Sequence, residues 1–263
     1  MKIALVQGNI VWEDVKRNLI HFTDKLSQVS ERVSLVVFPE AFTSGFTMNP
    51  HKIQSVSTFP VLDWLMEKAF EFNKSIAASA FVKEKNKLYN RMYWVNPDGT
   101  YQYYDKKHLF SHAGEDQIFT PGNKRVIVEK QGFKFNLQIC YDLRFPVWAA
   151  NRYDRFKKEY EYDVLLYVAH WPAKRKNAYL PLLRARAIEN QSYVLWVNRV
   201  GRDGQKNIYS GDSRIIHPDG KVLATAKSNN ESVLEFDLNL KELNDFRMSF
   251  PTGPDMDEFT VTD

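Results

Sequence analysis

The only cysteine among 263 residues, Cys140, stands at the end of an apolar run and is followed at once by the polar sequence YDLR. Two other reactive side chains occupy comparable places, because Glu40 ends the run VSLVVFPE and Lys106 follows the aromatic run TYQYYD. A structural cysteine can sit anywhere in a core, whereas a nucleophile has to emerge where a strand stops. A thiol, a carboxyl and an ammonium at three predicted strand ends therefore indicate nucleophilic catalysis with proton transfer.

Short apolar strands alternate with helices in the first part of the chain and would position Glu40. Residues 2–9 and 33–40 are rich in Val, Ile and Leu and predict buried strands. Apolar residues at roughly helical spacing over 19–29 predict a surface helix between them. A second helix is predicted to begin at Pro60 and to turn its residues Leu62, Leu65 and Phe70 inward, before another strand at 75–82.

Two Pro-Asp-Gly turns predict hairpins, at residues 96–99 and 217–220. Each hairpin follows a β-α-β pattern, and the second pattern contains the strand that ends at Cys140, a helix, the strand 163–171 and a helix near 181–191. The chain therefore reads as two comparable halves. No Pro/Gly/Ser-rich linker separates them, so we predict one α/β domain, residues 1–263, with two sheets.

Three motifs, FPEAF, YDKKHLF and QICYDLRFP, resemble the glutamate, lysine and cysteine motifs of the nitrilase superfamily of carbon–nitrogen hydrolases, in that family's order. Further matches over 119–123, 170–175, 184–201 and 209–220 extend the resemblance to nearly the whole chain and are most similar to the ω-amidase-like branch. That branch cleaves ω-amides of 2-oxo dicarboxylic acids. The resemblance implies a four-layer α-β-β-α sandwich and a homo-oligomer, a dimer or larger.

Amide hydrolysis explains why these residue types occur together. An amide is a poor electrophile with a poor leaving group, so attack by the Cys140 thiolate must be joined to proton delivery at nitrogen, which Glu40 can perform. Lys106 and the backbone N–H of Tyr141 would stabilise the oxyanion. Family alignment and strand alternation favour Lys106 over its neighbour in this role. Glu115 resembles a second family carboxylate that positions the lysine or the general base.

The substrate pocket is predicted to include Phe42 and Trp171 as lining residues, although aromatic side chains are more often simply core. Arg144 either binds a substrate carboxylate or forms a buried ion pair, with Asp142 or Glu189 as partner. Two positions depart from the family pattern. His170 stands where the resemblance implies asparagine, and Tyr179 where it implies tryptophan, both near the expected pocket.

A metal site is the alternative use of His108, His112 and Glu115, because the two histidines have i, i+4 spacing. The segment is not H-E-x-x-H, and cysteine amidase chemistry needs no metal, so we predict neither metal nor other cofactor.

Composition narrows the classes of function. The 36 Lys and Arg residues exceed the 32 Asp and Glu residues by only four, and basic and acidic residues are interspersed, so no nucleic-acid partner is predicted. The apolar runs are too short to span a bilayer, the start lacks signal-peptide features, and a single cysteine favours the reducing cytoplasm.

The leading hypothesis is an amidase for 2-oxoglutaramate or 2-oxosuccinamate. The alternatives are an N-carbamoyl amino-acid amidohydrolase and a non-catalytic oligomeric binding protein.

Overall fold

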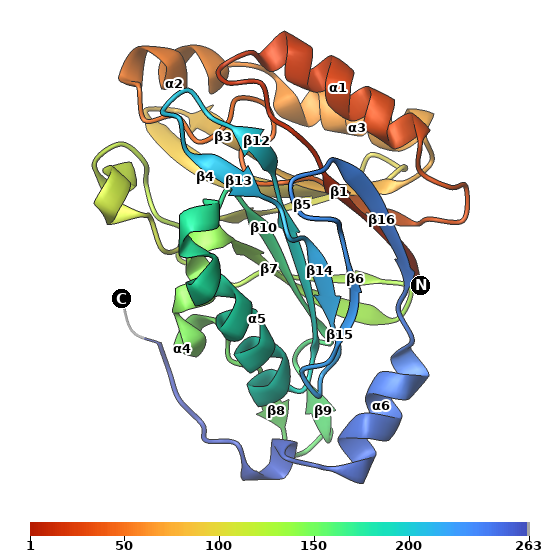
Figure 1. Ribbon diagram of the computed structural model, residues 1–263. Coiled ribbons are helices and arrows are strands. Elements are labelled where there is room, and N and C mark those ends of the chain that lie inside the picture. Colours follow the sequence, from red (N-terminus) through yellow and green to blue (C-terminus); the bar gives the residue numbers. More distant parts are fainter. Residues whose placement is uncertain (262–263) are drawn as a thin grey trace.

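The computed structural model describes residues 1–261, so the last two residues of the predicted 1–263 domain lie outside the described part. Two six-stranded sheets form its centre (Figure 1). In spatial order the first sheet contains β16 (Ser232–Asp237), β1 (Lys2–Gln7), β2 (Leu35–Val37), β3 (Ser75–Glu84), β4 (Lys87–Val95) and β5 (Tyr101–Asp105). The second contains β15 (Val222–Thr225), β14 (Arg214–Ile216), β11 (Tyr193–Asn198), β10 (Val164–Ala169), β7 (Phe133–Ile139) and β6 (Ile127–Lys130).

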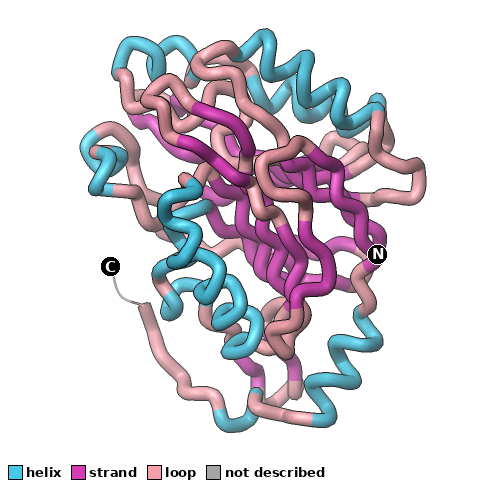
Figure 2. The backbone as a smooth tube through the Cα atoms, viewed as in Figure 1, coloured by secondary structure: helices cyan, strands magenta, loops and turns pink. Residues whose placement is uncertain are grey.

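Helices cover the outer faces of the two sheets, and the strands fill the middle (Figure 2). The helices are α1 (Val15–Ser27), α2 (Pro50–Val56), α3 (Val61–Glu71), α4 (Pro146–Ala149), α5 (Lys176–Asn190) and α6 (Leu240–Ser249). Short 3-10 turns are η1 (Ser111–Ala113), η2 (Glu115–Gln117), η3 (Cys140–Arg144), η4 (Ala173–Arg175) and η5 (Gly253–Asp255). Two small hairpins complete the described elements, β8 (Tyr153–Asp154) with β9 (Glu159–Tyr160), and β12 (Val200–Arg202) with β13 (Ile208–Ser210).

The inner faces of the two sheets pack against each other through one apolar cluster. Leu5 and Trp94 of the first sheet belong to the same buried cluster as Phe135 and Leu166 of the second, and the rings of Trp94 and Phe135 lie 5.0 Å apart. A strand buried on both faces reads as a continuous apolar run rather than an alternating one, which is why VLLYVA forms β10. The predicted α-β-β-α sandwich is confirmed.

Helices α1 and α3 lie on the outer face of the first sheet, where Phe22 and Leu65 are fully buried (Figure 1). The expectation that Phe70 points inward is wrong, since 77% of this residue is exposed. Residues four apart share one helix face, so Ala69 follows Leu65 into the core and Phe70 lies about 100° further round. Pro60 precedes α3 as its N-cap instead of being its first residue.

Both hairpins predicted at Pro-Asp-Gly turns are confirmed, because β4 pairs antiparallel with β5, and β14 with β15. Two predicted elements are shorter than expected. The strand over 33–40 is reduced to β2, and the helix expected between β7 and β10 consists only of η3 and α4. Strand β2 therefore ends before Glu40, which lies in the following loop. Within residues 1–261, no helix has the length and apolar character needed to cross a membrane.

We predict that Leu65→Ala destabilises the protein strongly and that Phe70→Ala hardly affects its stability. Loss of the buried Leu65 side chain leaves a cavity under α3 and should lower the free energy of unfolding by about 2–5 kcal/mol. Phe70→Ala on the same helix should change it by less than about 0.5 kcal/mol, because the ring is in solvent. Urea denaturation followed by circular dichroism measures both. Equal losses would mean that the register of α3 is misassigned.

Candidate active site

A cavity of about 550 Å³ opens where the ends of strands from both sheets meet. Its lining comes from five segments that are far apart in the sequence, 40–48, 106–113, 140–144, 170–175 and 203–209. Strand β5 ends immediately before Lys106, β7 ends immediately before Cys140, and β10 ends immediately before His170. The strand ends before Lys106 and Cys140, both singled out in the sequence, therefore deliver their next side chain to one place, and Glu40 reaches it from the loop after β2.

Cys140 is held in a turn that L-residues seldom adopt. Its φ is +45°, in the left-handed region, and the residue joins β7 directly to η3. Such a conformation persists only where surrounding structure enforces it, and it is common at catalytic positions. The N–H groups in the first turn of a helix have no acceptor within that helix. Tyr141, which directly follows Cys140, lies in this first turn and lines the cavity.

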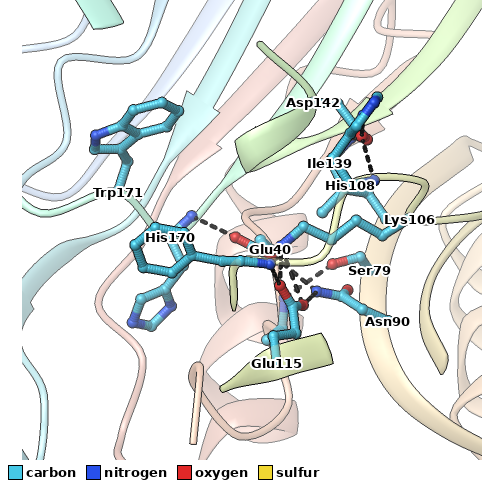
Figure 3. A network of polar contacts seen from close by, with 12 residues as sticks. Glu40, Ser79, Asn90, Lys106, His108, Glu115, Ile139, Asp142, His170 and Trp171 are labelled. Carbon is cyan, nitrogen blue, oxygen red and sulfur yellow. Dashed lines mark hydrogen bonds and ion pairs between the residues drawn. The ribbon is translucent and has the colours of Figure 1, made fainter. Parts of the chain in front are cut away.

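The Lys106 ammonium lies between two buried carboxylates (Figure 3). Its Nζ is 2.9 Å from Oε1 of Glu40, 3.1 Å from Oε1 of Glu115 and 2.9 Å from Oε2 of Glu115. Both carboxylates are fully buried, and Lys106 is 1% exposed. The neighbouring Lys107 extends elsewhere, with its Nζ 5.4 Å from the centre of the Trp148 ring. Lys106, the lysine expected from strand alternation, is thus the one that reaches the carboxylates.

Further donors fix the two carboxylates. The Asn90 amide donates to Oε1 of Glu40 at 2.8 Å and to Oε1 of Glu115 at 3.0 Å. The backbone N–H of His170 donates to Oε2 of Glu40 at 2.9 Å, and that of Phe110 donates to Oε2 of Glu115 at 2.6 Å. Glu40 and Glu115 are thereby held as a pair around one ammonium.

The electrostatics of the cluster favour a charged lysine and a neutral thiol. Burial acts to lower the pKa of Lys106, but the carboxylates of Glu115 and Glu40 outweigh it and hold this pKa above its ordinary value. Burial, followed by the Glu40 carboxylate, raises the pKa of the Cys140 thiol well above its ordinary value, although the Lys106 ammonium opposes the shift. The thiol therefore carries its proton at neutral pH and needs a base to become a nucleophile. The Glu40 carboxylate, which contributes to the raised pKa of the thiol, is the candidate base.

Two of the three predicted pocket residues line the cavity. Trp171 is almost completely buried in its wall, and the guanidinium of Arg144 lies 5.3 Å from the centre of the Trp171 ring. Arg144 is exposed and forms no ion pair with any carboxylate of the described residues 1–261. The alternative of a buried ion pair fails because Asp142 binds His108 and Glu189 binds Arg186.

Phe42 lies outside the cavity, contrary to expectation. Its ring is fully buried under α1 and α3, 5.4 Å from the ring of Phe22 and 5.6 Å from that of Trp64. The aromatic residue that reaches the site from this loop is Phe46, whose ring centre is 5.2 Å from Nζ of Lys106. Residues 40–46 form turns and not a strand, so neighbouring side chains in this loop point in unrelated directions.

Of the two departures from the family pattern, His170 lies at the cavity and Tyr179 lies behind its wall. The His170 ring lines the cavity and contacts the ring of Tyr209 edge-on at 4.5 Å. Burial, reinforced by the charge of Arg199, lowers the pKa of His170 well below its ordinary value, so the imidazole is neutral. Tyr179 does not line the cavity. Its hydroxyl donates to Asp212 at 2.8 Å, behind Trp171.

The side chains considered for a metal site face different partners. Nδ1 of His108 is 2.8 Å from Asp142, Glu115 holds Lys106, and His112 lines the outer part of the cavity. Among residues 1–261 no three His, Cys, Asp or Glu side chains gather in a way that would hold a metal ion. The i, i+4 spacing does not place the two histidines on one helix face, because His108 precedes η1 and His112 lies within it.

Several site residues were missed by the sequence analysis, notably Asn90, Phe46, Asp203 and Tyr209. Asn90 carried a signal, since it is a polar residue in the middle of the aromatic run LYNRMYW. No sequence feature indicated Asp203 or Tyr209, because the β12–β13 hairpin reaches the cavity only through tertiary packing. There the Tyr209 hydroxyl donates to Asp203 at 2.8 Å.

Comparison with known proteins agrees with this geometry. Residues 2–248 match the family model "Carbon-nitrogen hydrolase". An omega-amidase from Escherichia coli K12 is 43% identical over 261 residues, covering 99% of this chain and 98% of the relative. A 2-oxoglutaramate amidase from Bacillus subtilis is 30% identical, covering 97% and 96%.

Solved structures show the same architecture. A CN-hydrolase superfamily protein from Xanthomonas campestris, with an arsenic adduct in its active site, superposes with a TM-score of 0.95 at 37% identity and covers 100% of this chain and 99% of its own. A nitrilase superfamily member from Saccharomyces cerevisiae gives 0.82 at 26% identity, covering 95% and 94%. With the family model spanning almost all of its length, this chain belongs to the carbon–nitrogen hydrolase family.

Proposed function

We propose that the protein is a cysteine-dependent amidase that hydrolyses the ω-amide of a small dicarboxylic acid, 2-oxoglutaramate or 2-oxosuccinamate, to the acid and ammonia. The observation that carries the reaction class is the buried Lys106 ammonium between Glu40 and Glu115, in the cavity that also contains Cys140. Membership of the carbon–nitrogen hydrolase family supports the same chemistry. The choice of substrate rests on the cations of the cavity and on the names of the relatives.

Acylation begins when Sγ of Cys140 attacks the amide carbon while Glu40 takes the thiol proton. The carbonyl oxygen becomes an oxyanion, which accepts hydrogen bonds from the Lys106 ammonium and the Tyr141 N–H. Glu40 then gives its proton to the amide nitrogen, the C–N bond breaks, and ammonia leaves. The product is a thioester on Cys140.

Deacylation uses the same groups on a water molecule. Glu40, ionised again, takes a proton from water, and the resulting hydroxide attacks the thioester carbon. The second oxyanion again faces Lys106 and Tyr141. When the C–S bond breaks, the thiolate regains its proton from Glu40 and the carboxylic acid leaves. Lys106 acts throughout as an electrophile and not as a base, because two carboxylates stabilise its charged form.

The outer part of the cavity suits an anionic substrate tail. Arg144, Lys174 and Arg175 line it, and the Arg175 guanidinium lies 4.9 Å from the centre of the Phe110 ring. Neither arginine forms an ion pair with the described carboxylates, so each keeps its donors for a ligand. A carboxylate bound there would point the distal amide of a short dicarboxylic acid monoamide toward Cys140.

We predict that Cys140→Ala abolishes ammonia release without unfolding the protein. The thiol forms the covalent bond, whereas the small side chain leaves only a small cavity. Ammonia assays, circular dichroism and thermal melting test this together. Full activity would remove Cys140 from the mechanism, and loss of folding would make it a structural residue.

The second prediction separates the two lysines. Lys106→Ala should lower the rate of the chemical step by about 100-fold or more, because a charged donor to the oxyanion is lost. Its melting temperature should also fall, since two buried carboxylates lose their counter-ion. Lys107→Ala is the matched control and should keep most of its rate. Single-turnover measurements per folded enzyme check this, and the reverse ranking would reassign the electrophile.

The third prediction concerns the substrate. Values of kcat/KM should be higher for 2-oxoglutaramate than for glutamine or a neutral amide of similar length. Arg144→Ala and Arg175→Ala should lower the value for the anionic substrate roughly 10- to 100-fold and leave the neutral amide unaffected. Arg17→Ala, on the exposed surface of α1, is the control.

Equal values for all three amides would contradict the carboxylate clamp while leaving the cysteine chemistry intact. An N-carbamoyl amino acid belongs in the same panel. If it releases ammonia and the amides do not, the protein is the carbamoyl hydrolase instead.

A further inference from the structure

The Asp142 carboxylate, which takes no part in the proposed chemistry, is fully buried and accepts four hydrogen bonds. Oδ2 accepts from the backbone N–H of Ile139 at 2.9 Å and from the Tyr104 hydroxyl at 2.8 Å. Oδ1 accepts from the backbone N–H of His108 at 3.0 Å and from its ring Nδ1 at 2.8 Å. Figure 3 shows Asp142 next to Ile139 and His108. One carboxylate thus collects donors from two separate segments.

The residues that donate these bonds lie close in sequence to Lys106 and Tyr141, the two proposed donors to the oxyanion. Ile139 directly precedes Cys140, whereas His108 lies two residues beyond Lys106. The Tyr104 hydroxyl, besides donating to Asp142, accepts the backbone N–H of Lys107 at 3.2 Å. Asp142 therefore connects the turn that carries the nucleophile to the segment that carries the lysine.

No strand pairing makes this connection. Lys106 follows β5, which is the edge strand of the first sheet, and Cys140 follows β7 in the second sheet. The backbone hydrogen bonds of a sheet join only strands of that sheet. The separation between Lys106 and the Tyr141 N–H must consequently be set by side chains between the sheets, and an oxyanion site tolerates little error in that separation.

The packing of the His108 ring fixes the direction of its hydrogen bond to Asp142. A carboxylate only accepts hydrogen bonds, so Nδ1 carries the proton. The imidazole stacks on the Phe145 ring at 3.8 Å with an angle of 8° between the planes, and it meets the Trp148 ring edge-on at 6.1 Å. The ring is fixed by packing on one side and by the carboxylate on the other.

We propose that Asp142 and His108 form a positioning pair that fastens the Lys106 segment to the Cys140 turn and so sets the geometry of the oxyanion site. The pair touches neither substrate nor the reacting atoms and acts through Lys106 and Tyr141. The inference rests on the cysteine amidase chemistry proposed above, but not on the identity of the substrate.

His108 is the member to substitute, because removing the Asp142 carboxylate would leave four buried donors without an acceptor and endanger folding. His108→Ala removes the ring bond and keeps the backbone one. His108→Asn restores the bond without the ring, since its amide nitrogen reaches about the position of Nδ1. His217→Ala is the matched control. His217 also pairs through Nδ1 with an aspartate, Asp219, at 2.9 Å and packs against aromatic rings, but it lies at the β14–β15 turn.

Activity is measured as kcat and KM on an amide that the wild-type protein hydrolyses. The concentration of folded protein is determined by gel filtration and circular dichroism, and melting temperatures are recorded in parallel. His108→Ala should lower kcat per folded site by about 100-fold, with little change in KM. His108→Asn should recover most of that loss. His217→Ala should keep the wild-type kcat per site even if its melting temperature falls.

Three results would overturn the proposal: a wild-type kcat per site in His108→Ala, an asparagine variant as impaired as the alanine variant, or an equal loss in His217→Ala. If His108→Ala does not fold, the asparagine variant decides alone, because positioning by the hydrogen bond requires it to stay active. Absence of turnover in the wild-type protein with every amide and carbamoyl compound would count against the proposed function itself, a result separate from these comparisons.

Discussion

The site depends on one buried ammonium held between two carboxylates. Taking Lys106, Glu40 and Glu115 out of water costs several kcal/mol per ion, and this cost is offset only because each charge is paired and hydrogen-bonded. Burial, together with the Glu40 carboxylate, raises the pKa of the Cys140 thiol and keeps its proton in place. In the proposed mechanism, proton transfer to Glu40 therefore accompanies attack on the substrate and does not precede it.

The two sheets contribute different halves of this chemistry. Glu40, Lys106 and Glu115 follow strands of the first sheet, whereas Cys140 and His170 follow strands of the second. His170 also links the halves directly, since its backbone N–H donates to Glu40. Because the apolar contact between the sheets fixes their relative position, the core that stabilises the protein also sets the distances in the site.

A hydrogen bond to Asp142 supports the strained turn at Cys140. A residue at φ +45° needs surrounding contacts that hold it, and the Ile139 N–H bond to Asp142 supplies one immediately before the turn. The Asp142 carboxylate, the Tyr104 hydroxyl and the Trp148 indole form a continuous buried network, with Trp148 donating to Tyr104 at 3.0 Å. The positions of Cys140 and Lys106 are consequently coupled through polar contacts as well as through packing.

The sequence by itself determined the residue types, their order and the local elements, since these follow from short-range pattern. Apolar runs marked the strands, Pro-Asp-Gly marked both hairpins, and reactive residues that follow apolar or aromatic runs marked Glu40, Lys106 and Cys140. Only the tertiary structure decided which side chains meet across the sheets. Asn90 joining Glu40 to Glu115, Asp142 binding His108 instead of Arg144, and Phe46 replacing Phe42 at the cavity are all examples. Such contacts join residues far apart in the chain, and packing of the two sheets selects them, which no local periodicity records.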